Sequence, residues 1–333
     1  MSAETMEWLN TMTRIGYTDT RGTAWHYRQG ATNHYPGSIP LDVVENLLNV
    51  SVESRPIYVM VDGEPQEIDG RQAMVCTDNH DVLGIFKEGY RGHNYREWLI
   101  DGPASIVDTS KGELGFGSAG LLRNRAVAWV QLETPETVST AEGVSFRPSM
   151  LATTSYDGTV ASTYAETVTV VVCDNTLSMA LGENRGKYRV KHTKNSRIVL
   201  NDAREALGIV AGIADDFTAL VAEWCATEVS PKVWTKVLDA LAPMPAEGAK
   251  ANAVTLAEKK RDTLAALYAN DPRVAPWSGT AFGVVQAFNT YTLHESRVNG
   301  EKPRAIRNME AILSGKVADS DQATLRALEV ALA

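Results

Sequence analysis

The sequence predicts an α+β fold, in which helices flank an antiparallel β-sheet and a helical region follows at the C-terminus. β-Branched, apolar runs separated by turn residues occupy residues 56–172, a pattern typical of strands. Apolar residues return at helical spacing over 195–227 and over much of the chain after residue 250. We therefore divide the 333 residues into an N-terminal segment with short helices at 1–54, an α+β core at 55–230 and a helical C-terminal region at 231–333.

The N-terminal segment carries two short apolar repeats. The spacing of Met6, Leu9, Met12 and Ile15 predicts an amphipathic helix within residues 1–20. A loop containing Trp25-His26 follows, and a second short helix is expected over residues 41–50. Pro and Gly residues between them interrupt any longer helix.

The core begins with three expected strands at 57–61, 73–77 and 82–86, where His80 lies on the tight turn before the last one. A helix beginning near Asn94 is expected to bury aromatic side chains and to stop at Gly102-Pro103. Longer strands are then expected at 114–122, 126–132, 146–155 and 159–172. Asp157-Gly158 separates the last two, and this dipeptide is a strong hairpin signal, so we interpret Asp157 as part of the architecture and not as a catalytic group.

The chain changes character after residue 172. Asp174 or Asn175 can cap a short helix whose apolar positions include Leu177. The segment 184–201, which follows Glu183, contains no acidic residue. Its cations at 185, 187, 189 and 191 alternate, so an extended chain would direct all four to one face.

Beyond the basic segment the chain is expected to be helical. Ser230-Pro231 is a capping pair for a helix to Leu241, and residues 243–248 form a Pro- and Gly-containing linker. Further helices are expected at 254–269, 280–297, 304–314 and 319–332.

Charge and composition restrict the class of protein. The formal net charge of −9 argues against a wholly basic nucleic-acid binder, although a local basic stripe can still confine a polyanion. No apolar run approaches the roughly 18 residues that span a bilayer, and the acidic N-terminus does not resemble a signal peptide, so we expect a cytoplasmic protein. The three cysteines, Cys76, Cys173 and Cys225, are expected to be reduced thiols.

Motifs for cofactors and catalysis are weak. Residues 115–120 match the dinucleotide pattern G-x-G-x-x-G, but a strand and not a helix is expected to follow, so we interpret these glycines as a twisted or bulged strand. No metal, cofactor or catalytic residue is assigned. An enzyme centred on Cys173 and His192, with His26 or His93 nearby, remains an alternative, because a helix N-terminus lowers a thiol pKa.

Several stretches of the chain together carry a resemblance to a known family. They are Arg21–His26, Cys76–Gly84, Ser118–Leu122, Tyr156–Gly158, Val172–Leu177 with Ala180, Lys191–Thr193 and Ser278–Gly283. These stretches resemble the phage- and plasmid-like proteins grouped as domain-of-unknown-function family 932. The resemblance covers most of the chain and implies a mobile-element context without an assigned reaction. Asp174 stands where the family more often has an amide.

The expected order of a helix, a β-meander and a helix beside basic residues is also similar to the core of single-strand annealing proteins. That likeness implies assembly into rings or filaments and a basic groove beside the sheet. It is an analogy of architecture, and a fold does not define a function.

The favoured hypothesis is a phage or plasmid accessory protein that binds nucleic acid, with single-stranded DNA in annealing or recombination as the favoured ligand, and that forms a homo-oligomer. Tyr188 can stack on a base or pack on the strand face opposite the cations. Besides the enzyme, a host-interaction protein of the anti-restriction type is a third hypothesis. The expected contact residues are Arg185, Lys187, Tyr188, Arg189, Lys191, His192, Lys194, Arg197 and Arg204.

Overall fold

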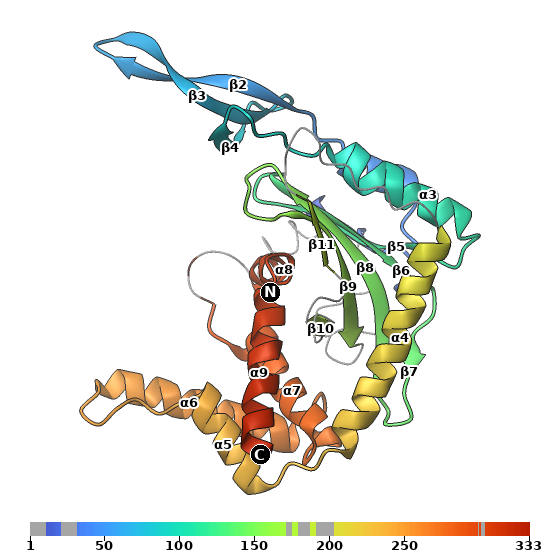
Figure 1. Cartoon of the computed structure of the whole chain (residues 1–333), viewed down its shortest axis with the longest axis vertical. Helices are drawn as coiled ribbons and strands as arrows, with labels where there is room; N and C mark the ends of the chain where they lie inside the picture. Colours follow the sequence, from blue (N-terminus) through green and yellow to red (C-terminus); the bar gives the residue numbers. More distant parts are fainter. Residues whose placement is uncertain are drawn as a thin grey trace.

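A large antiparallel sheet forms the centre of the molecule (Figure 1). The computed structural model describes residues 11–20, 32–170, 175–178, 187–190, 203–298, 300 and 304–333. The strand order is β1-β5-β6-β8-β9-β10, with β7 beside β8 and β11 on the same edge of β9 as β10. The strands are β1 (Thr13–Ile15), β5 (Gly115–Leu122), β6 (Val127–Glu133), β7 (Val138–Ser139), β8 (Ser145–Ser155), β9 (Ser162–Val170), β10 (Asn175–Ser178) and β11 (Lys187–Val190).

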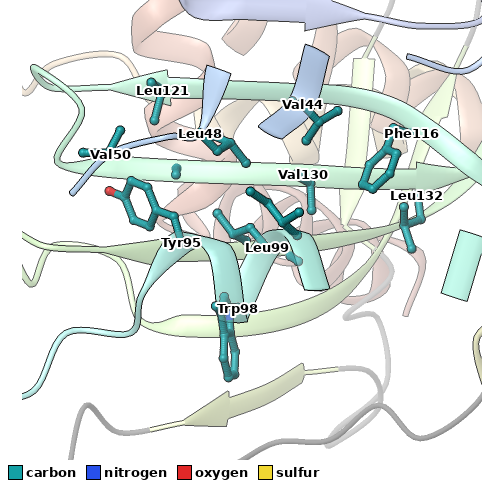
Figure 2. Packing of buried hydrophobic residues seen from close by; sticks show 14 of the residues in the cluster. Val44, Leu48, Val50, Tyr95, Trp98, Leu99, Phe116, Leu121, Val130 and Leu132 are labelled. Atoms are coloured by element: carbon teal, nitrogen blue, oxygen red, sulfur yellow. The ribbon is translucent and has the colours of Figure 1, made fainter. Parts of the chain in front are cut away.

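One face of this sheet, the helix face, is covered by apolar helices. The π-helix η1 (Arg96–Asp101) runs into α3 (Gly102–Thr109), and with α2 (Leu41–Leu47) they cover β5, β6 and β8. Figure 2 shows Leu99 of η1 beside Val130, while the Trp98 side chain points away from Val130 and Leu132. The Trp98 indole N–H donates to the Thr153 carbonyl at 2.9 Å, which fixes η1 to β8.

The long helix α4 (Ala203–Ala226) crosses the same face farther along β8 and β9. Phe217 packs edge-on against Phe146 with ring centroids 4.6 Å apart. Phe282 and Val285 of α7 (Ala281–Thr290) join this cluster, so α4, α7 and the sheet share one apolar cluster.

The remaining helices follow the expected order. Ser230 caps α5, because its hydroxyl accepts a hydrogen bond from the Val233 N–H at 3.3 Å. These helices are α5 (Pro231–Leu241), α6 (Ala251–Asn270), η2 (Ala275–Trp277), η3 (Tyr291–Glu295), α8 (Arg304–Leu313) and α9 (Lys316–Leu332).

A second, three-stranded sheet consists of β2 (Val52–Val61), β3 (Glu64–Cys76) and β4 (Val82–Lys87). Asp62 and Gly63 join β2 to β3 with φ angles of 51° and 89°. Positive φ at both central residues defines the tight turn that matches strand twist. Figure 1 shows β2 and β3 extending away from the large sheet, and we call residues 57–70 the projecting hairpin.

Most of the expected elements are confirmed, and five expectations are wrong. A turn-rich loop is expected between the strands at 57–61 and 73–77, but β3 already begins at Glu64. Thr13–Ile15 is a strand paired with β5, not a helix. Residues 175–178 are also a strand, because they pair with β9 instead of starting a helix. Gly102-Pro103 does not end the helix, since Pro103 fits the first turn of α3, where its missing N–H costs nothing. Only Gly158 of the Asp157-Gly158 pair has positive φ, and a longer loop joins β8 to β9.

The glycine-rich motif lies within β5, as expected, and carries a bulge at Gly117. A Cβ at Gly117 would overlap the Glu133 carboxyl group, and one at Gly120 would overlap the Trp129 ring. The glycines are therefore required because side chains of β6 lie across β5.

Candidate nucleic-acid interface

The face of the large sheet opposite α4 carries hydroxyl groups at successive register positions. In β8 and β9, Leu151 is opposite Ala165, Thr153 opposite Thr163, and Ser149 opposite Thr167. Opposite residues of antiparallel strands share a face. We call the face formed by Leu151, Thr153, Thr163, Ala165 and Thr167 the threonine face.

Helix α8 covers one end of this face. Its apolar side chains pack against Trp129, Leu151 and Val160. Arg123 donates to Asp157 at 3.1 Å and to Glu310 of α8 at 2.9 Å, which ties the helix to the loop before β9. Asp157 thus has an architectural role, as its position in the sequence indicates.

A cavity of about 360 Å³ lies where the threonine face meets the junction of α8 and α9. Apolar walls and hydroxyl groups both line it, so it can accept a flat or aliphatic group together with hydrogen-bonding atoms. Gly315, with φ of 82°, precedes α9, and no side chain caps this helix. The α9 N-terminus, which carries partial positive charge, forms part of the cavity wall, and Asp319 in its first turn offsets part of that charge. The lining residues are Leu151, Thr153, Gly158–Ala161, Thr163, Ala165, Thr167, Ile312–Gly315, Val317 and Ala318.

β11 brings two of the expected contact residues to the same edge of the sheet. Lys187 is opposite Ala165 and Arg189 is opposite Thr163, so their register positions belong to the threonine face. Tyr188 is opposite Tyr164, a position of the helix face. The backbone is extended over 187–190, which is the condition under which alternating cations share one face.

The other expected contact residues are not brought to this face by the described structure. Arg204 belongs to α4, whose apolar side chains pack on the helix face. Cys173 and His26 of the enzyme alternative lie outside the described residues. So do the remaining expected contact residues, which are Arg185, Lys191, His192, Lys194 and Arg197.

A hydrogen-bonded row crosses the threonine face. The Ser118 hydroxyl donates to the Gln131 side-chain oxygen at 2.8 Å, and the Gln131 amide donates to Ser149 at 2.6 Å. Ser149 and Thr167 share a hydrogen bond of 2.7 Å. This row joins four strands and ends at a cavity residue, so it fixes the hydroxyl positions that line the cavity.

Arg147 and Glu133 form a buried ion pair on the two middle strands of this row, where Glu133 is opposite Ser149. The Arg147 Nε–Glu133 Oε2 distance is 3.0 Å, and the two side chains are 1% and 0% exposed. Arg147 also donates to the Thr134 carbonyl at 2.7 Å and lies over the Tyr17 ring at 5.1 Å. Sequence reasoning missed this pair, although a charged residue within an apolar strand run is the signal that marks it.

His93 and Ser162 were not singled out as a pair, yet the structure joins them beside β11. His93 Nδ1 lies 2.6 Å from the Ser162 hydroxyl, and its ring stacks on Trp98 at 4.7 Å. This distance would suit a nucleophile and its base. Ser162 is fully buried and also bonds Thr154 at 2.6 Å, so the pair holds the start of β9 in place.

His93 predicts a pH dependence of stability. Burial lowers the pKa of its imidazole below the ordinary value of 6.5, against an opposing effect of Glu97. The unfolded chain then binds the proton more readily, so the free energy of unfolding should fall as pH decreases below about 6.5. Urea unfolding between about pH 5 and pH 8 should show a smaller change in His93→Gln than in the wild type. Equal pH dependence in the two proteins would contradict this role.

The fold and the site define an α+β protein. Helix α4 packs on one face of its antiparallel sheet, and the hydroxyl-lined cavity lies on the other face. β11, which contains Lys187 and Arg189, forms the edge of the sheet beside this cavity. The family model described as Domain of unknown function (DUF932) matches residues 82–323, and the chain belongs to that family. The matched range begins at β4, so it excludes the projecting hairpin. No curated protein and no solved structure matches the chain. In the described ranges no helix is both long and apolar enough to cross a bilayer.

Proposed function

We propose that this protein binds single-stranded nucleic acid, with DNA favoured, on the threonine face beside β11. The role that fits is annealing or recombination of strands on phage or plasmid DNA. The observation that carries the proposal is the register of β11, because it aligns Lys187 and Arg189 with residues that line the cavity.

Three features of the site support this assignment. Cations at alternate positions of an extended strand can follow the phosphates of an extended nucleic-acid backbone. Threonine hydroxyls and the α9 N-terminus can donate to phosphate oxygens. The apolar walls of the cavity can receive the face of a base.

The test is a binding titration with a fluorescently labelled single strand and its duplex over a series of salt concentrations. If the four alternating cations each neutralise one phosphate, the slope of log affinity against log salt should be about −3 for the single strand. Tighter binding of the single strand than of the duplex is expected. The absence of binding at low salt, or binding that salt does not weaken, would contradict the proposal.

A further inference from the structure

The projecting hairpin exposes large apolar side chains on both of its faces. Tyr58 and Met60 are 55% and 65% exposed, while Val59 and Val61 are 46% and 40% exposed. Alternate residues of a strand point to opposite faces, so both faces of this two-stranded ribbon carry exposed apolar side chains. Exposed apolar surface of this kind marks an interaction site. A two-stranded hairpin is also only marginally stable alone in water, so contact with a partner would stabilise it.

Proline limits strand addition at one edge of the hairpin, the free edge of β3. The two-residue turn makes Val61 and Glu64 a hydrogen-bonded pair, so Met60 and Pro65 form the next, non-hydrogen-bonded pair. The backbone groups of Pro65 therefore face the free edge of β3, where proline offers no N–H. A partner is thus expected to contact the faces of the hairpin.

The charge of the hairpin specifies the kind of partner. Residues 57–70 contain four acids and no Lys or Arg; the acids are Asp62, Glu64, Glu67 and Asp69. They would repel a nucleic acid and an identical hairpin. The complementary surface must combine apolar contact area with positive charge.

We propose that the projecting hairpin of one copy of this chain docks on the threonine face of a second copy. That face carries a cavity with apolar walls, including Ile312 and Leu313, and the register positions of Lys187 and Arg189. Met60 or Tyr58 enters the cavity, and the hairpin carboxylates meet the cations.

The contact joins two different surfaces of the chain. Such head-to-tail contacts build rings or filaments. The inference goes beyond the proposed function and does not depend on it, because the hairpin can dock on the face in the absence of nucleic acid. Where nucleic acid is present, the two would compete for the same cavity and cations.

Sedimentation velocity at low salt tests the self-association. The wild-type chain should show a sedimentation coefficient that rises with concentration in the micromolar range, and Tyr58→Ser/Met60→Ser should stay at the monomer value. Val82→Ser/Ile85→Ser is the matched control, because these β4 side chains are 60% and 59% exposed in the same sheet but lie outside the hairpin. It should associate as the wild type does. A monomeric wild type, or association that survives in the hairpin variant, would overturn the proposal.

A charge-exchange experiment tests the pairing of the two surfaces. Glu64→Lys/Glu67→Lys and Lys187→Glu/Arg189→Glu should each remain monomeric alone. An equimolar mixture should associate, because the first variant supplies an intact threonine face and the second an intact acidic hairpin. A mixture that stays monomeric would overturn the assignment of this face.

The hairpin variant also separates this inference from the proposed function. Glu64→Lys/Glu67→Lys leaves β11 unchanged, so it should bind the labelled single strand at least as tightly as the wild type. Loss of assembly with retained oligonucleotide binding is therefore the expected result. Failure of oligonucleotide binding in every protein would refute the proposed function without affecting the docking result.

Discussion

Replacement of Arg147 by Ala is expected to lower the free energy of unfolding by about 3–5 kcal/mol. The substitution removes the guanidinium that lies 3.0 Å from the buried Glu133 carboxylate, and the Thr134 carbonyl loses its donor at 2.7 Å. An uncompensated charge inside a protein is costly because water no longer solvates it. Urea unfolding monitored by circular dichroism measures the change.

Arg96→Ala is the matched control for this prediction. Arg96 pairs with Glu45 at 3.1 Å, but its side chain is 64% exposed, so its removal should cost about 0–1 kcal/mol. The double substitution Arg147→Met/Glu133→Leu should cost less than Arg147→Ala, because no unpaired charge remains. A cost for Arg147→Ala as small as that of the control would contradict the importance of the buried pair.

Reversal of charge at Lys187, Arg189 and Lys191 should weaken single-strand binding on the order of 100-fold or more at low salt. Each charge-assisted hydrogen bond to a phosphate contributes about 1–1.5 kcal/mol, and removal of three such bonds accounts for this factor. The salt slope should also become less steep by about 2, because three phosphates are no longer neutralised. Anisotropy titrations of the triple Glu variant against the wild type provide both numbers.

The control for this experiment also replaces basic residues by glutamate, but at positions away from β11. Lys232 and Lys250 are exposed on the C-terminal helical region, so Lys232→Glu/Lys250→Glu changes the net charge without touching the threonine face. Its affinity should stay within a few-fold of the wild type. Equal weakening by both variants would show that binding depends on total charge and not on β11.

Local chemistry explains which turns could be predicted from the sequence. Asp157-Gly158 was expected to form a tight hairpin, but only Gly158 has positive φ and a longer loop is formed. The same dipeptide at Asp62-Gly63 forms the two-residue turn, with positive φ at both positions. The dipeptide permits the turn, while the pairing of the strands on either side decides where it forms.

Long-range pairing explains the errors in secondary structure. Residues 175–178 carry a capping residue and helical spacing, yet β9 offers them an unpaired edge, and they become a strand. Thr13–Ile15 pairs with β5, which lies far along the chain, in the same manner. A short window of the sequence, such as those used to predict secondary structure, cannot contain both Thr13–Ile15 and its partner strand β5.

The candidate site was predictable only in part. The alternation of cations predicts a shared face if the segment is extended, and β11 is extended over Lys187–Val190. The cavity beside it was not predictable, because Thr163 and Ser314 of its wall are distant in sequence. The projecting hairpin was missed as a surface because exposure cannot be read from an apolar strand pattern.

Cross-linking of a photoactivatable single strand to the full chain, followed by mass spectrometry of the linked peptides, shows directly where the nucleic acid lies. Cross-links are expected in β11 and in the cavity wall, at residues 159–167 and 312–318. The same sites should disappear in the triple Glu variant. Cross-links confined to α6 or to the projecting hairpin, with none on the threonine face, would refute binding on this face.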